Sequence, residues 1–169
     1  MQDIGEADQQ RRAQARLAGG IHHSRQGHAA HVRAGAHVDL AFAVVVAGQS
    51  VVFNNDEDKE IDHNVYTLGA EQKNFDIFPK GKSVTYAFTK TGEVSLYCSV
   101  HKLMDGKLFV APSAAWAELA EDGSFSIAGV APGTYTLRTY QKAKRFRDVE
   151  LKVTVKAGEA ATVAVEMKR

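Results

Sequence analysis

A cysteine, a histidine and a methionine stand close together in the sequence as Cys98, His101 and Met104. Apolar residues alternate before them, at Val94 and Leu96, which predicts a strand that ends at the cysteine. The thiolate, imidazole and thioether would then lie on one short loop. Soft sulfur donors combined with imidazole suit copper, and electron-transfer copper sites combine one cysteine, two histidines and a weak axial methionine. The loop therefore offers three of the four donors of such a site.

A second histidine, His63, stands upstream of this loop. It follows a Val/Phe-rich strand and a polar turn, at the start of an alternating segment. Taken singly, a buried cysteine, a lone histidine or a core methionine is an ordinary residue. Taken together, the four donors have matching softness and converge on one metal. The sequence therefore predicts one copper ion bound by His63, Cys98, His101 and Met104.

Three short motifs in this region resemble the cupredoxin family. They are Phe-Asn-Asn-Asp at 53–56, His-Asn-Val at 63–65 and Tyr-Cys-x-x-His-x-x-Met-x-Gly at 97–106. The spacing from histidine to methionine is closer to amicyanin, and to the cupredoxin-like proteins associated with methylamine utilisation, than to plant plastocyanin. The resemblance covers roughly residues 47–111. It implies a Greek-key β-sandwich with one type 1 (blue) copper ion.

The same resemblance assigns roles to individual residues. His101 would be the surface port for electrons, in an apolar rim that includes Val100 and Leu103 and is interrupted by Lys102. Asn64 would hold the two ligand loops together through hydrogen bonds, behind the ligands themselves.

The resemblance further implies single-electron transfer between redox partner proteins in the periplasm. A periplasmic protein is expected to carry a secretory signal, but the first residues lack the basic start and the apolar core of one. A misassigned start codon would explain the missing signal. An alternative is a periplasmic copper-binding or copper-delivery protein without an electron-transfer role, and a third is a structural β-sandwich without metal. No nucleophile–base pair or carboxylate pair stands at catalytic spacing, so we do not expect an enzyme.

Short strands separated by turn residues are expected to position these donors. The candidates are Asp39–Val46, Ser50–Asn54, His63–Leu68, Ser83–Phe88, Glu93–Cys98 and Lys107–Ala111. Regularly spaced strands without helical periodicity predict an all-β sandwich or barrel. We expect this cupredoxin domain to span residues 38–112.

A second β-rich segment, residues 113–169, follows Pro112. Strands are predicted at Trp116–Leu119 and Ser124–Ile127, as a hairpin. The segment Gly129–Leu137 then continues into a strand to Tyr140, and two alternating runs end the chain. The segment resembles the carboxypeptidase regulatory-like, transthyretin-like β-sandwich, but lacks one or two strands before the hairpin. Either residues near 38–46 supply a strand, so that the copper domain is inserted into the sandwich, or the incomplete sheet packs on the cupredoxin. The second arrangement is favoured.

Residues 1–37 are rich in Ala, Arg, Gln, Gly and His and poor in core-forming residues. This composition predicts a disordered or misannotated segment, apart from a short helix around Ala7–Leu17, that is dispensable for folding. Its histidines could scavenge metal, although compositional bias is the favoured interpretation; they are His22, His23, His28, His31 and His37.

Overall composition excludes several classes of protein. The formal net charge is +1 in 169 residues and the basic residues are dispersed, which does not favour nucleic-acid binding. The single cysteine excludes an intrachain disulfide framework. No apolar run reaches the roughly 20 residues of a transmembrane helix.

Overall fold

The computed structural model describes residues 12–18, 30–34, 42–101, 104–141 and 145–169. In this part of the chain every regular element is a strand, which confirms the all-β prediction. The strands are β1 (Arg12–Ala18), β2 (Ala30–Ala34), β3 (Ala43–Val46), β4 (Ser50–Asn55), β5 (Tyr66–Gly69), β6 (Lys73–Asn74), β7 (Ser83–Ala87), β8 (Gly92–Tyr97), β9 (Asp105–Ala111), β10 (Phe125–Ala128), β11 (Gly133–Arg138), β12 (Glu150–Val155) and β13 (Ala160–Glu166). No helix among these residues could span a membrane.

The chain divides into two compact units. One unit comprises Arg25–Ala114, and the other combines Met1–Ser24 with Ala115–Arg169. The first unit is therefore inserted, along the chain, between two parts of the second. We call them the inserted unit and the split unit.

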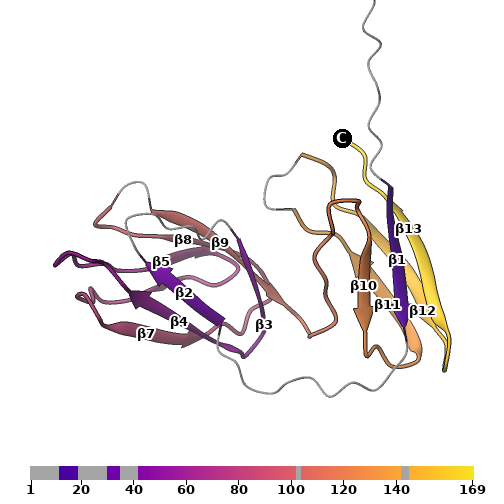
Figure 1. Cartoon of the computed structure of the whole chain (residues 1–169), viewed down its shortest axis with the longest axis horizontal. Coiled ribbons are helices and arrows are strands. Elements are labelled where there is room, and N and C mark those ends of the chain that lie inside the picture. The colour runs from indigo at the N-terminus through magenta and orange to yellow at the C-terminus, as the bar shows by residue number, and fades with distance from the viewer. Residues whose placement is uncertain (1–11, 19–29, 35–41, 102–103, 142–144) are drawn as a thin grey trace, which may run out of the picture. The chain divides into compact units, whose positions relative to one another are not determined.

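The inserted unit is a sandwich of two sheets, whose strands, apart from β6, are labelled in Figure 1. One sheet has the order β2-β4-β7 and the other the order β3-β9-β8-β5-β6. The pairs β2–β4 and β3–β9 are parallel, and the remaining pairs are antiparallel. The register brings Cys98, one residue past β8, level with the start of β9, because Tyr97 pairs with Asp105.

Alternating apolar residues from both sheets form the core of the inserted unit. Val51 and Phe53 of β4 face Val94 of β8 and Leu108 of β9, and all four are almost fully buried. The rings of Phe53 and Phe88 meet edge to face, with centroids 6.5 Å apart, within the range of about 4.5–7 Å that is typical of aromatic pairs. The period of two along each strand places the residues between them on the outer face.

The split unit also contains two sheets, β10-β1-β13 and β11-β12. Ile127, Val153 and Val155 form its small buried core. β1 runs parallel to β10 and antiparallel to β13, and so occupies the centre of its sheet. The strand that the sequence analysis found missing before the hairpin is therefore supplied by residues 12–18. This connectivity is the insertion alternative, but residues 43–46 form β3 of the inserted unit instead.

The structure differs from the sequence expectation within residues 1–37. Arg12–Ala18 is a strand where a short helix was expected, and Ala30–Ala34 is a second strand, paired with β4. Composition indicates only how much apolar surface a segment can bury. The backbone of β1, however, also forms hydrogen bonds on both sides, because this strand lies between β10 and β13. The remainder of this segment lies outside the described residues.

The hairpin expected at Trp116–Leu119 is also absent. Only its second strand forms, as β10, and it pairs with β1 rather than with residues 116–119. The turn itself is present, because the Gly123 amide donates to the carbonyl of Ala120 at 2.9 Å and the Ala120 amide to that of Ser124 at 2.8 Å. A long-range partner thus replaced the local one.

Candidate metal centre

His63 is placed by a short bridge to a neighbouring segment. Its amide donates to the carbonyl of Phe78 at 3.1 Å, and the Phe78 amide donates to the carbonyl of His63 at 2.7 Å. The buried side chain of Asn55, at the end of β4, donates to the carbonyls of Ile61 and Phe78 at 2.8 and 3.1 Å. The loop that leads to His63 is therefore fastened at both ends.

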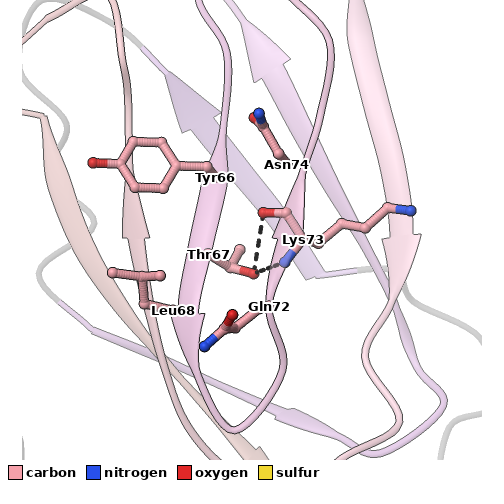
Figure 2. A pocket seen from close by; sticks show the side chains of 6 residues that line it. All are labelled: Tyr66, Thr67, Leu68, Gln72, Lys73 and Asn74. Carbon is pink, nitrogen blue, oxygen red and sulfur yellow. Dashed lines mark hydrogen bonds between the residues drawn. The ribbon is translucent and has the colours of Figure 1, made fainter.

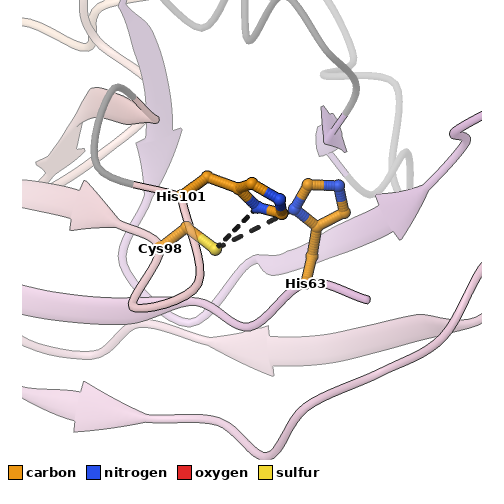
Figure 3. Close-up of side chains that lie close together, drawn as sticks. All are labelled: His63, Cys98 and His101. Carbon is orange, nitrogen blue, oxygen red and sulfur yellow. Dashed lines mark hydrogen bonds between the residues drawn. The ribbon is translucent and has the colours of Figure 1, made fainter. Parts of the chain in front are cut away.

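Cys98 and Met104 begin and end a tight loop between β8 and β9. The Cys98 amide donates to the carbonyl of Met104 at 3.2 Å, and the Met104 amide donates to the carbonyl of His101 at 3.3 Å. The first bond continues the β8–β9 pairing beyond the strands, and the second lies within the loop. The side chains of Cys98 and His101 consequently emerge on the same side, as Figure 3 shows.

Three donor atoms converge at this place (Figure 3). The Sγ of Cys98 lies 3.9 Å from Nδ1 of His63 and 3.8 Å from Nδ1 of His101. All three candidate ligand atoms lie within 4.8 Å of one another. His63 is 1% exposed and Cys98 8%, whereas His101 is only half-buried. The cluster thus has a buried side and a side that reaches solvent through His101.

The other residues singled out by the sequence are less fully placed. Met104 is half-buried and ends the loop that carries Cys98 and His101, but its role as the axial ligand stays a prediction. Leu103 and Lys102, expected near the rim, lie outside the described residues, whereas Val100 is 45% exposed. Of the five amino-terminal histidines, His31 falls in β2 and the other four lie outside the described residues.

The side chain of Asn64 joins the two ligand-bearing segments. Its Oδ1 accepts hydrogen bonds from the amide and the hydroxyl of Ser99, both at 2.8 Å. Its Nδ2 donates to Oδ1 of Asn74 at 3.1 Å and to the carbonyl of Phe75 at 3.4 Å. One buried amide therefore links the residue after His63 to the residue after Cys98.

Sequence reasoning missed Glu57, whose buried carboxylate contacts the far side of the His63 ring. Oε1 of Glu57 lies 3.1 Å from Nε2 of His63. The sequence around it is an acidic stretch, 56–62, in which nothing distinguishes one carboxylate from another. Only the fold of the loop shows that Glu57 turns inward while Asp58 and Glu60 stay exposed.

A second buried carboxylate, Glu71, contacts none of the donors. It accepts hydrogen bonds from the hydroxyl of Tyr86 at 2.6 Å and from the amides of Thr89 and Lys90 at 2.8 and 2.9 Å. Burial alone would raise the pKa of Glu71, but these hydrogen bonds together outweigh it and the pKa is lowered. Glu71 thus stabilises the sandwich as an anion.

The donor cluster fits copper in its chemistry. One cysteine and two histidines, with a methionine on the same loop, form the ligand set of a type 1 copper site. The Cys98 thiol must lose its proton to bind a metal, and both imidazoles present Nδ1 to its sulfur. Among the described residues, the side chains of His63, Cys98 and His101 lie close enough together to hold a metal ion.

A shallow hollow of about 320 Å³ lies at the β5–β6 hairpin and is drawn in Figure 2. Within it, the Thr67 hydroxyl accepts a hydrogen bond from the Lys73 amide at 2.8 Å and lies 3.4 Å from the Lys73 carbonyl. None of the metal donors lines this hollow. The hollow therefore contributes nothing to the metal centre.

Comparison with protein families matches residues 115–163 to domain II of polysaccharide lyase family 4. The match covers less than half of the chain and lies within the split unit. This family is not the carboxypeptidase regulatory-like family. The resemblance of residues 113–169 to the latter therefore stays a prediction. No curated protein matches the sequence.

Several solved copper proteins are similar to part of the chain. A purple cupredoxin from Nitrosopumilus maritimus is 21% identical with a TM-score of 0.37, over 41% of this chain and 77% of that one. An amicyanin variant in its Cu(I) state is 23% identical with a TM-score of 0.42, over 48% and 81%. A copper-containing nitrite reductase from Thermus scotoductus is 24% identical with a TM-score of 0.38, over 41% and only 19%. Similarity at these values indicates no function by itself.

Proposed function

We propose that the inserted unit is a type 1 copper protein that carries single electrons between redox partner proteins. His63, Cys98 and His101 would bind the ion, with Met104 as the weak axial ligand. The observation that carries the proposal is the convergence of one thiolate sulfur and two Nδ1 atoms within 4.8 Å of one another. Copper bound there would supply a one-electron couple between Cu(I) and Cu(II).

The burial of the cluster supports a carrier rather than an enzyme. His63 and Cys98 are buried, whereas His101 is half-buried and has the exposed Val100 beside it. An electron can leave through the imidazole of His101 without exchange of ligands. An apolar residue beside it allows a partner to approach closely with little desolvation cost.

The cellular role follows from the same proposal. The redox partners would be proteins that dock at the His101 face, and the compartment would be the periplasm, as the cupredoxin resemblance implies. Asn64 would keep the two ligand segments in register, since its amide bonds both. A centre held in this way changes little between the oxidation states, which favours electron transfer.

Reconstitution of the full chain with Cu(II) tests the proposal. We expect an intense visible absorption from the transition between the Cys98 thiolate and copper, with reversible bleaching on reduction. Cys98→Ser should remove the colour, and Ser95→Ala, in the middle of β8, should retain it. A colourless Cu(II) complex of the unaltered protein would refute the blue-copper assignment. Colour followed by release of the metal on reduction would favour a copper-delivery protein instead.

A further inference from the structure

Strand β11 of the split unit, labelled in Figure 1, has one edge that no other described strand covers. It pairs with β12 along its whole length, from Gly133 to Arg138, and β12 is the strand at the end of this two-stranded sheet. Most residues of β11 are exposed. An edge strand presents unpaired backbone amides and carbonyls, which are a template for pairing with a further strand.

The hydrogen bonds next to β11 show which backbone groups face this edge. Just beyond the strand, the Thr139 amide donates to the carbonyl of Val149 at 3.0 Å, so the backbone of Thr139 faces the β12 side. Along an antiparallel pair, residues alternate between facing the partner and facing away from it. The amides and carbonyls of Thr134, Thr136 and Arg138 therefore point away from β12, toward the uncovered edge.

Strand β11 lacks the features that prevent pairing at a sheet edge. Charged side chains, above all lysine, and proline protect edge strands, and Gly133–Leu137 contains none of them. The neighbouring β12 carries Glu150 and Lys152, and a tight turn, in which the Glu159 amide donates to the carbonyl of Lys156 at 3.3 Å, leads it into β13. The uncharged edge strands β3, β7 and β10 are shorter than β11.

We propose that β11 is an interface between two copies of this chain, in which it pairs antiparallel with β11 of the second copy across a two-fold axis at Thr136. Thr136 then lies opposite Thr136 of the second copy, and Thr134 lies opposite Arg138. Every outward-facing residue of one strand meets an outward-facing residue of the other, and each such pair exchanges two backbone hydrogen bonds. No like charges face each other, and because each copy has one β11, the association closes at the dimer.

The side chains of β11 are self-complementary in this register. Tyr135, which is 41% exposed, lies opposite Leu137 of the second copy at the closer, non-hydrogen-bonded spacing, where aromatic and aliphatic side chains pack well. On the other face of the sheet, the two Thr136 side chains form a favourable cross-strand pair. The Tyr135 hydroxyl donates to the carbonyl of Ala131 at 2.8 Å, so the ring is already fixed and loses little freedom on pairing.

Sedimentation velocity of the full chain at increasing concentration tests the association. We expect a reversible dimer and no larger species, with weak affinity because one pair of short strands buries less than about 1,200 Å². Thr136→Lys places two ammonium groups opposite each other at the axis and should weaken the dimer at least about tenfold. The control Thr154→Lys adds the same charge to the same face, on β12, and should leave the dimer unchanged.

Three outcomes of the sedimentation experiment would overturn the proposal. They are a monomer at every accessible concentration, open-ended larger assemblies, and a dimer that Thr136→Lys weakens no more than Thr154→Lys does. The last of these would locate the contact between copies on another surface. Retention of the far-ultraviolet circular dichroism spectrum shows that each variant is folded.

Cysteine substitutions test the register independently. In Thr136→Cys the two thiols face each other across a hydrogen-bonded pair with Cα atoms about 5.5 Å apart, within the roughly 4.4–6.8 Å that a disulfide spans. In the control Thr134→Cys the two Cα atoms lie about 14 Å apart along the paired strands. The native Cys98 is buried in both variants.

Mild oxidation of the metal-free chains, followed by non-reducing gel electrophoresis, measures the cross-link. We expect covalent dimers of Thr136→Cys and monomers of Thr134→Cys. Equal cross-linking of the two variants, or none in Thr136→Cys, would overturn the two-fold pairing. Neither experiment depends on bound copper, so the result is independent of the proposed function.

Discussion

The hydrogen bonds of Asn64 lead to a quantitative prediction for Asn64→Ala. Two of them end on Ser99, which is exposed, so water can replace the lost partner and each contributes about 0.5 kcal/mol. The other two end on Asn74 and on the Phe75 carbonyl, and each contributes about 0.5–1 kcal/mol. The free energy of unfolding should therefore fall by roughly 2–3 kcal/mol.

Urea unfolding of the metal-free protein, followed by circular dichroism, measures this loss. With a slope of about 2 kcal/mol per molar urea, the midpoint should fall by about 1–1.5 M while the slope stays constant. Because Asn64 joins the segments that carry His63 and Cys98, the variant should also release bound copper faster. The control is Asn54→Ala, which loses the hydrogen bond from the exposed Ser83 hydroxyl.

The outcome can refute the structural reasoning directly. If Asn64→Ala loses no more stability than Asn54→Ala and keeps copper equally well, the two ligand segments are held by something other than this amide. A large loss of stability with unchanged copper release would limit Asn64 to a folding role.

Three further predictions concern the two units separately. Because the pKa of Glu71 is lowered in the folded state, the charged carboxylate stabilises the protein at pH values above its usual pKa of 4.5, and this contribution is lost as the pH falls through the folded-state pKa. The difference in the free energy of unfolding between the unaltered protein and Glu71→Gln, measured by urea unfolding, should therefore shrink below about pH 4.5. Gly69→Ala should destabilise by more than 1 kcal/mol, because a Cβ at this φ of +102° would collide with the Glu93 carbonyl oxygen, whereas Gly48→Ala, also at positive φ (+84°), meets no atom within 4 Å and should cost less in the same assay. Deletion of residues 1–24 should expose the strand edges that β1 covers, so limited proteolysis should cut the split unit while the copper spectrum persists; equal protease resistance would contradict the central place of β1.

Local pattern was sufficient for most strands of the inserted unit. The alternation of Val94, Leu96 and Cys98 predicted a strand that ends at the cysteine, and β8 ends at Tyr97. Such a prediction succeeds because the period of two is a property of each strand by itself. The register and the sheet partners of β8 carry no comparable local signal.

The misses share a physical cause. Arg12–Ala18 has little apolar character, and its strand depends on β10 and β13, which lie more than a hundred residues further along the chain. Trp116–Leu119, in contrast, was expected to be a strand and is not, because its expected partner Phe125–Ala128 pairs with β1. Long-range backbone pairing overrides local preference in both cases.

The sequence by itself determined the donor types of the candidate metal centre. Cys98, His101 and Met104 lie within seven residues, and a single loop must bring them close together whatever the fold. Tertiary structure alone decided that the His63 ring meets this loop and that Asn64 and Glu57 hold it there, because each of those contacts depends on how loops from different strands meet. It also decided the insertion of one unit into the other, because no local pattern in β1 indicates a partner strand so distant in sequence.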